Sequence, residues 1–318
     1  MTATTETAAP ADVFRHEAML YAGPADFVAG TVPFIIDGLS AGEPVLVAAE
    51  PTKLDLVRAA LDRDADRVRF ADLADVGRNP SRIIPVWHDF VDECGSGGQR
   101  VRGIGEPIWA GRTAAEVVEC QVHESLLNLA FADSTPWTLI CPYDTDALDP
   151  GVIDRAYRSH PMTRRGDARR PSTSYRAPSE ELASIGHALP EPTEVLEQRT
   201  VVFERLHDMR SAVARCATSL GLGSERTADL VIAVDELASN SAQYGGGDAT
   251  MRLWQDEDCI VCEVTDRGAI DEPLVGRHRP ALNAPSGRGL WLVNQLCDLV
   301  QLRTSAGGTV VRLHMALR

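Results

Sequence analysis

The chain has 318 residues, of which 44% are hydrophobic and 24% are charged, and its formal net charge is −15. This length is sufficient for two globular domains with separate cores. The acidic balance argues against nucleic acid as a partner, because binding to a phosphate backbone needs clustered Lys and Arg. The N-terminus lacks the basic and apolar regions of a signal peptide, and no apolar run is long enough to span a bilayer. We therefore expect a cytoplasmic protein with no membrane partner.

The sequence from 13 to 162 predicts a first domain, preceded by a Thr- and Ala-rich stretch at 1–12 that is typical of a disordered tail. Short apolar runs in this domain alternate with longer segments of helical spacing. The expected helices are 27–39, 52–61, 81–93 and 113–131, and the expected strands are 44–49, 68–70, 101–104 and 137–141. This alternation predicts an α/β domain with a mostly parallel sheet between helical layers.

Several polar residues of the first domain are candidates for a pocket that senses a small ligand. These are His16, Glu50, Glu106, His123, Tyr143 and Asp144. Four of them follow predicted strands, and ligands usually bind at the carboxyl ends of the strands of a parallel sheet. The alternative is that these residues cap helices, pair on the surface or satisfy polar groups of the core.

Residues 163–192 contain paired arginines, four prolines and several serines, which predicts a linker with one short helical piece at 180–184. A second domain is predicted from 193 to 318. Its expected helices are 202–220, 224–244 and 289–297, and its expected strands are 251–255, 259–265, 299–304 and 309–315. Residues 269–286 contain three prolines and no periodicity, which favours a loop of the lid type.

The long helix of the second domain carries Glu236 and Asn240, which are four residues apart and therefore lie on one face. A carboxylate and a carboxamide in this arrangement can hold a water, a hydroxyl or a hydrated Mg²⁺ between them. Two further motifs follow: Asp266-Arg-Gly268 at the end of an apolar strand, and Gly287-Arg-Gly289 at the start of a helix. Together the three motifs indicate a nucleotide site.

A set of short segments in the first domain follows a known pattern. The segments are 16–21, 34–47, Gly105-Glu-Pro107, His123-Glu124 with Asn128, Cys141-Pro-Tyr-Asp144 and His160-Pro161. They resemble the MEDS sensory domain, named for methanogen and methylotroph regulators, and the resemblance implies a domain that senses a small carbon compound. The run GLSAGEPVLVAAE is also similar to RecA-like and KaiC-like ATPases. The Walker A loop of those ATPases is missing, so a RecA-like sheet without Walker A is expected.

From residue 195 onward, the order of elements and motifs resembles the GHKL ATPase superfamily, in particular RsbW-like anti-sigma factors and serine/threonine kinases. The resemblance implies a two-layer α/β sandwich that binds ATP and Mg²⁺. It implies Glu236 as the catalytic general base and Asn240 as the Mg²⁺ ligand. The ATP-binding residues that it implies are Asn240, Asp266, Gly268, Gly287, Arg288, Gly289, Leu290 and Thr309.

Two departures from the family pattern bear on activity. Tyr244 stands where relatives usually have His, and Ala269-Ile270 replace the customary second glycine after Gly268. ATP binding is therefore a safer expectation than phosphoryl transfer.

Three functions remain open for the chain. The favoured one is an ATP-dependent serine/threonine protein kinase that acts as an anti-sigma factor and is gated by the first domain. The alternatives are a two-component histidine kinase, for which His187 or His207 is the candidate acceptor, and a non-catalytic ATP-responsive sensor or scaffold. The expected partners are a sigma factor or its antagonist protein and a small ligand of the first domain, with a homodimer left open.

Overall fold

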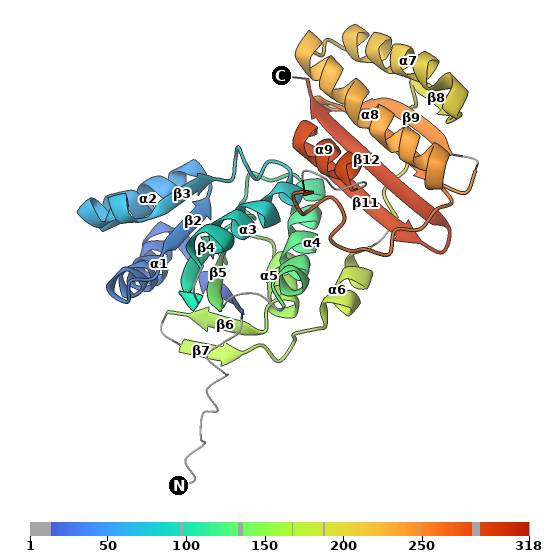
Figure 1. Ribbon diagram of the computed structural model, residues 1–318. Coiled ribbons are helices and arrows are strands. Elements are labelled where there is room, and N and C mark those ends of the chain that lie inside the picture. The colour runs from blue at the N-terminus through green and yellow to red at the C-terminus, as the bar shows by residue number, and fades with distance from the viewer. Residues whose placement is uncertain are drawn as a thin grey trace. The chain divides into compact units, whose positions relative to one another are not determined.

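The computed structural model describes residues 14–95, 98–132, 136–166, 168–186, 188–247, 249–281 and 287–317. The chain forms two compact units (Figure 1). Unit 1 comprises Met1–Val76 and Val86–Glu181, and unit 2 comprises Gly77–Pro85 and Leu182–Arg318. The predicted tail at 1–12 and His187 lie outside the described residues. In the part of the chain that the structure describes, no helix is long and apolar enough to cross a membrane.

Unit 1 contains a seven-stranded sheet in the order β3-β2-β4-β5-β1-β6-β7. All neighbouring strands are parallel except β6 and β7, which form an antiparallel hairpin. The strands are β1 (Arg15–Tyr21), β2 (Val45–Ala49), β3 (Arg69–Asp72), β4 (Val101–Gly105), β5 (Trp137–Asp144), β6 (Met162–Arg165) and β7 (Ala168–Pro171). The predicted mostly parallel α/β sheet is confirmed.

Helices cover both faces of the unit 1 sheet. They are α1 (Gly23–Ser40), α2 (Pro51–Leu61), α3 (Ile83–Cys94), α4 (Ala114–Ala130) and α5 (Pro150–Ser159), with 3-10 turns at Asp62–Arg67 and, in the segment assigned to unit 2, Pro80–Arg82. Helix α6 (Pro178–Ile185) follows β7, and its Glu181 pairs with Arg155 of α5. One core joins α1 and α2 to sheet residues such as Met19, Val47 and Ile140. On the opposite face α3 packs closely, because a Cβ at Gly105 would lie 2.9 Å from the Trp87 ring.

Helix α4 begins where the sequence predicts it. The Thr113 hydroxyl accepts a hydrogen bond from the Glu116 N–H at 3.3 Å, and the Glu116 carboxylate accepts one from the Thr113 N–H at 2.7 Å. This capping box satisfies two backbone donors that the first turn leaves without helical partners. Helix α4, which begins at this capping box, contains Glu124 and Asn128.

The linker predicted from residue 163 begins later in the structure. Strands β6 and β7 occupy its first residues and extend the sheet beyond β1. The arginines of this stretch are not simply solvated, because Arg169 forms a 2.6 Å ion pair with the buried Glu17 of β1. Helix α6 contains the short helical piece predicted at 180–184.

Unit 2 contains a five-stranded antiparallel sheet in the order β11-β12-β10-β9-β8. Its strands are β8 (Glu197–Thr200), β9 (Thr250–Asp256), β10 (Cys259–Asp266), β11 (Leu299–Ser305) and β12 (Gly308–Ala316). Its helices are α7 (Leu206–Ser219), α8 (Ser224–Tyr244) and α9 (Arg288–Leu296), with a 3-10 turn at Phe203–Arg205. One hydrophobic core joins residues of the three helices to those of the sheet. This arrangement confirms the predicted α/β sandwich of GHKL type.

The opposite face of the unit 2 sheet carries a buried ion-pair network. Glu263 is 2% exposed and accepts hydrogen bonds from Arg252 at 2.5 Å and from Arg312 at 2.7 Å. Arg312 also donates to the carbonyl of Pro190, and Arg252 pairs with Glu191. The chain that precedes β8 is thereby attached to this face of the sheet.

Two predictions for unit 2 are wrong in detail. The helix predicted from residue 202 begins at Leu206, and Val202 lies outside it with its side chain exposed. Strand β8 at Glu197–Thr200 was not predicted, because four residues that are mostly polar show no apolar alternation. Their pairing with β9 is a tertiary contact that fixes their conformation.

Candidate functional site

Helix α8 presents the predicted Glu236 and Asn240 toward the first turn of α9. A Cβ added at Gly289 would lie 2.9 Å from the Glu236 Oε2 atom and 2.9 Å from the Asn240 Nδ2 atom. Both side chains therefore converge on one backbone position that only glycine leaves open. Both residues are half-buried, so their polar atoms remain within reach of an outside group. The structure thus brings together two of the three sequence motifs.

The start of α9 has the geometry of an anion site. Gly287 precedes the helix in the left-handed conformation, with φ +88°, and Arg288 is exposed in the first turn. The first N–H groups of a helix have no helical acceptors, so they favour phosphate or carboxylate ligands. Leu290 packs on the hydrophobic core. It also lies against Gly276, because a Cβ added at Gly276 would be 2.9 Å from the Leu290 Cβ. Residues 282–286 of the predicted lid loop lie outside the described residues.

Asp266 lies at the end of β10, beside the end of α8. Its carboxylate accepts hydrogen bonds from the Ser241 hydroxyl at 2.5 Å and from the Gly268 N–H at 2.8 Å. A Cβ at Gly245 would lie 2.8 Å from the Asp266 Cβ, so the helix must end in glycine at this contact. A carboxylate offers about four acceptor positions, and these two bonds leave capacity for an external N–H donor.

Thr309 completes this part of the site from β12. It is buried, and its hydroxyl donates to the Gly268 carbonyl at 2.8 Å. The preceding Gly308 has φ +123°, and a Cβ there would lie 2.0 Å from the Asp266 carbonyl oxygen. The chain around Asp266 is therefore fixed by hydrogen bonds and by close backbone contacts. The predicted role of Thr309 in ATP binding stays a prediction.

Tyr244, which replaces the usual His of the family pattern, has a side chain that is 68% exposed. Only its backbone approaches the site, because a Cβ at Gly268 would lie 3.0 Å from the Tyr244 carbonyl oxygen. The substitution at 244 therefore leaves the surroundings of Asp266 intact. The other departure follows Gly268: the Ile270 N–H is held by the Thr304 hydroxyl at 3.3 Å.

In unit 1 the predicted sensory residues fall into separate groups, and sheet register explains why. Strands β1 and β5 pair with Ala18 opposite Cys141 and Tyr21 opposite Asp144. Successive side chains of a strand point to opposite faces, so His16 and Cys141 share one face while Tyr21 and Asp144 share the other. The six candidates do not form one pocket.

On the α1/α2 face, four residues form a cluster that we call the tyrosine cluster: Tyr21, Lys53, Glu106 and Asp144. The Tyr21 hydroxyl donates to Glu106, and the Lys53 ammonium donates to the Tyr21 hydroxyl at 2.5 Å. Lys53 also lies 3.9 Å from Glu106 and 4.0 Å from Asp144. Glu50 occupies the N-cap position of α2 without a side-chain capping hydrogen bond, and it contributes a nearby negative charge.

Burial dominates the electrostatics of the tyrosine cluster. It raises the pKa of Glu106 to about 8, against the opposing effects of the Lys53 charge and the Tyr21 hydrogen bond. Burial, followed by the charge of Glu106, raises the pKa of Tyr21 well above its usual value. Glu106 is 1% exposed, and among the described residues its Oε2 atom has no hydrogen-bond partner. The cluster therefore favours a neutral Glu106 at neutral pH.

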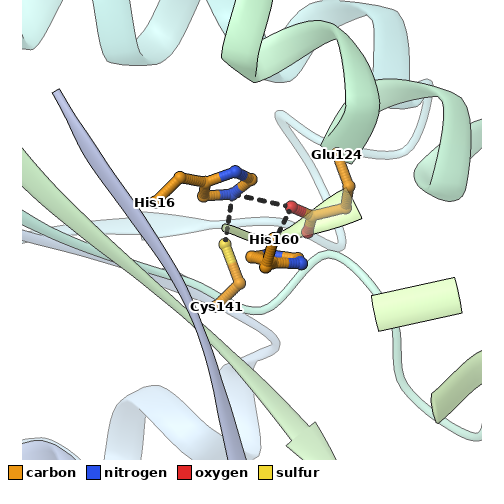
Figure 2. A group of neighbouring side chains, drawn as sticks. All are labelled: His16, Glu124, Cys141 and His160. Carbon is orange, nitrogen blue, oxygen red and sulfur yellow. Dashed lines mark hydrogen bonds and ion pairs between the residues drawn. The ribbon is translucent and has the colours of Figure 1, made fainter. Parts of the chain in front are cut away.

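On the α3/α4 face, another four residues form a group that we call the tetrad: His16 on β1, Glu124 on α4, Cys141 on β5 and His160 after α5. Figure 2 shows their side chains pointing toward one another. The His16 Nε2 atom lies 3.1 Å from the Glu124 Oε2 atom and 3.3 Å from the Cys141 Sγ atom. The His160 Nε2 atom lies 3.3 Å from the same carboxylate oxygen. All four residues are at most 2% exposed.

Burial and mutual contact shift the ionisation of the tetrad. Burial, followed by the nearby His160, lowers the pKa of His16 to about 4. Burial disfavours the charge on Glu124, but the hydrogen bonds from the two histidines outweigh it and lower the pKa of this carboxyl. Burial, followed by the Glu124 charge, raises the pKa of the Cys141 thiol well above its usual value.

Two other predicted residues lie near the tetrad without belonging to it. His123 precedes Glu124 on α4 and is 1% exposed, but it is not one of the four residues whose ligand atoms converge. The Tyr143 ring meets the His160 ring edge-on, with 5.6 Å between centroids. Burial, followed by the Glu124 charge, raises the pKa of Tyr143.

The six predicted sensory residues did not include Lys53, Glu124, Cys141 or His160, although the sequence also marks Glu124 and His160 as polar candidates of that domain. Three of these four residues lie in the segments that resemble the MEDS pattern, so the signal was present in the sequence. The missing information was which residues of distant segments face one another. Their grouping depends on strand register and on the position of α4, which a single sequence does not specify.

Known families match both units of the chain. The MEDS family, the methanogen/methylotroph DcmR sensory domain, matches residues 15–161, and the histidine kinase-like ATPase domain matches residues 202–315. A search of the curated proteins finds no match. The chain thus contains an N-terminal MEDS sensory domain and a C-terminal kinase-like ATPase domain.

Two solved structures are similar to part of the chain. One contains the RsbU and RsbW domains of Rv1364c from Mycobacterium tuberculosis, at 20% identity and a TM-score of 0.30, covering 39% of this chain and 33% of that chain. The other is the histidine kinase AdeS from Acinetobacter baumannii, at 11% identity and a TM-score of 0.24, covering 39% of this chain and 68% of that chain.

Proposed function

We propose that this chain, which joins a MEDS sensory domain to a histidine kinase-like ATPase domain, is an anti-sigma factor with ATP-dependent serine/threonine protein kinase activity. Its substrate is a hydroxyl of an antagonist protein, and its sensory domain gates the reaction in response to a small ligand. One observation carries the proposal: Glu236 and Asn240 converge on the backbone of Gly289 at the open start of α9. A general base, a metal ligand and a phosphate-binding helix terminus are then adjacent.

The residues present fit an adenine nucleotide with Mg²⁺, which supplies the phosphoryl group when bound. Asn240 holds the metal through its carboxamide oxygen, and the N–H groups at Gly289 and Leu290 bind phosphate oxygens. Asp266 accepts a hydrogen bond from the adenine amino group with the capacity left by Ser241 and Gly268. Glu236 takes the proton from the substrate hydroxyl.

The test is phosphoryl transfer from labelled ATP with Mg²⁺ to candidate antagonist proteins, followed by identification of the labelled side chain. Acid-stable label on Ser or Thr of the partner supports the proposal. Acid-labile label on the chain's own histidine, such as the exposed His207 on α7, instead indicates a histidine kinase. Nucleotide binding without transfer indicates a non-catalytic sensor.

Two variants of α8 separate catalysis from binding. Glu236→Ala is expected to retain ATP binding and to slow transfer by about 10²–10⁴-fold, because it removes the general base. Asn240→Ala is expected to lose Mg²⁺-dependent binding. The matched control is Glu225→Ala, an exposed carboxylate in the first turn of the same helix. Transfer at the wild-type rate by Glu236→Ala would show that the general-base assignment is wrong.

A further inference from the structure

The tetrad of unit 1 is a convergence of four metal-ligand atoms in the interior of the domain. One atom from each of His16, Glu124, Cys141 and His160 lies within 4.8 Å of all the others. Zn²⁺ binds His and carboxylate at about 2.0–2.1 Å and Cys at about 2.3 Å, so tetrahedral ligand atoms lie roughly 3.3–3.6 Å apart. The contacts of 3.1, 3.3 and 3.3 Å within the tetrad are close to this spacing.

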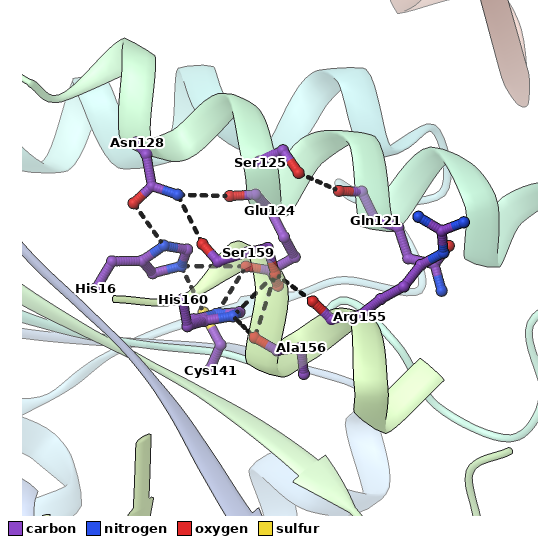
Figure 3. Close-up of polar contacts among 10 residues, drawn as sticks. All are labelled: His16, Gln121, Glu124, Ser125, Asn128, Cys141, Arg155, Ala156, Ser159 and His160. Carbon is purple, nitrogen blue, oxygen red and sulfur yellow. Dashed lines mark hydrogen bonds and ion pairs between the residues drawn. The ribbon is translucent and has the colours of Figure 1, made fainter. Parts of the chain in front are cut away.

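Hydrogen bonds outside the tetrad fix how both histidines face it (Figure 3). The His16 Nδ1 atom lies 3.1 Å from the Asn128 Oδ1 atom, and the Asn128 amide is oriented by donating to the Ser159 carbonyl at 2.8 Å. The His160 Nδ1 atom lies 2.9 Å from the Ala156 carbonyl. Both Nδ1 atoms therefore carry the proton, as in histidines that bind metal through Nε2.

With these tautomers, and with no cation or additional proton between them, the Nε2 lone pairs of both histidines face the Glu124 carboxylate. The Nε2 atoms of both rings lie beside the Glu124 Oε2 atom, at 3.1 Å for His16 and 3.3 Å for His160. Among the described residues, the His160 Nε2 and Glu124 Oε1 atoms have no hydrogen-bond partner. Acceptors that approach one another in a dry interior need a proton or a metal cation between them, and four converging ligand atoms suit a metal cation.

Charge balance favours a divalent cation. Glu124 is 1% exposed, and the only bases within ion-pair distance in the described ranges are His16 and His160. A thiolate at Cys141 and a carboxylate at Glu124 supply two negative charges, and two neutral imidazoles supply none. Four such ligands therefore neutralise one divalent ion, which makes its burial acceptable. Mixed N, S and O ligands are those that Zn²⁺ accepts, whereas Mg²⁺ and Ca²⁺ prefer oxygen.

We propose that His16, Glu124, Cys141 and His160 bind one Zn²⁺ ion in the sensory domain. The thiol of Cys141 loses its proton to solvent as the ion binds. With four protein ligands and little exposure, the centre is of the closed, structural type. It joins β1, α4, β5 and the end of α5, which are far apart in sequence, so its binding energy stabilises the folded domain.

The first measurement is Zn²⁺ binding by the full chain after treatment with a chelator. Titration against a chromogenic zinc indicator is expected to give one tight equivalent per chain. Cys141→Ser is expected to lose that equivalent. Cys120→Ser is the matched control, because Cys120 is also a buried thiol of unit 1 but donates to the Pro107 carbonyl outside the tetrad. Absence of a tight equivalent in the wild type, or its retention by Cys141→Ser, would overturn the proposal.

Two further readouts keep the proposal testable if Cys141→Ser does not fold. Co²⁺ added to the wild type is expected to give a thiolate charge-transfer band and strong visible bands of tetrahedral geometry. Asn128→Ala removes the acceptor of the His16 Nδ1 proton without removing a ligand, and it is expected to weaken Zn²⁺ affinity about 10–100-fold. A Co²⁺ spectrum without the thiolate band, or unchanged affinity in Asn128→Ala, would contradict the assignment.

Discussion

In unit 1 the charged side chains of the tyrosine cluster and of the tetrad are mostly withdrawn from solvent, and they find their partners within the domain. In unit 2 Glu236, Asn240 and Asp266 are half-buried, and glycines at 245, 268 and 289 leave space around them. In unit 1 the buried polar groups are part of the folded core, so their ionisation is coupled to the stability of the folded state. The arrangement in unit 2 leaves polar groups available to a ligand. A polar group with spare bonding capacity beside a glycine is therefore a better sign of a nucleotide site than a polar group in a core.

The sharpest test of buried ionisation concerns Glu106. Its pKa rises from 4.5 to about 8 on folding, so the folded state binds more protons than the unfolded state between these values. The contribution of Glu106 to the stability of the folded state is therefore full below about pH 4.5. It is lost as the pH rises toward 8. At about 1.4 kcal/mol per pH unit, the loss is at most about 5 kcal/mol. Glu106→Gln is expected to remove this dependence.

The measurement is hydrogen exchange of amides in β1 and β4 across that pH range, in the wild type and in Glu106→Gln. Asp55→Asn is the control, because Asp55 is 77% exposed and pairs only with Arg58 among the described contacts. An equal pH dependence of local stability in the wild type and in Glu106→Gln would show that Glu106 is not the titrating group.

A second test fills the space that glycine leaves in unit 2. Gly289→Ala places a methyl group 2.9 Å from the Glu236 and Asn240 side chains, which must then move. We expect ATP analogues to bind more weakly by about 1–3 kcal/mol, as in overpacked sites. Isothermal titration calorimetry with a non-hydrolysable analogue and Mg²⁺ measures this. Gly223→Ala is the matched control, because the φ of −60° at Gly223 suits alanine and a Cβ added there would have no neighbouring atom within 4 Å. An equal loss of affinity in Gly223→Ala would refute the steric explanation.

The smallest effect is expected at Thr309. Thr309→Val removes the hydroxyl that donates to the Gly268 carbonyl at 2.8 Å and preserves the shape of the side chain. The expected decrease is about 1 kcal/mol in the stability of unit 2, measured by denaturant unfolding. Thr309→Ser keeps the hydrogen bond and is expected to lose less. If Thr309→Val and Thr309→Ser lower the stability of unit 2 equally, the Thr309 hydrogen bond does not support the chain around Asp266.

Much of the fold could be predicted from the sequence because its elements carry local signals. The helix predicted at 224–244 ends at Tyr244 as α8 does, since its apolar periodicity is regular and three glycines follow it. Its N-cap was expected at Ser224 and is Gly223. The hairpin of β11 and β12 was predicted from its Gly-Gly turn. Strands β1, β6, β7 and β8 and helix α5 were not predicted. Strands β6, β7 and β8 are short and mostly polar and lack alternation, and sheet pairing with β1 and β9 specifies them instead. Strand β1 is buried between β5 and β6, and the sequence marked 16–21 only as part of the MEDS pattern.

The sequence by itself determined the two-domain order and the main periodic elements, and it supplied the motif residues of the proposed nucleotide site. Those motifs are local: Glu236 and Asn240 share a helix face, and Asp266 and Gly268 share a turn. Only the tertiary structure decided which distant residues meet. The α8 side chains of Glu236 and Asn240 occupy the space where a Cβ at residue 289 would lie. Strand register places His16 with Cys141 and separates both from Glu106. The physical reason is that alternation along a strand is visible in one sequence, whereas the register between strands depends on packing of the whole domain.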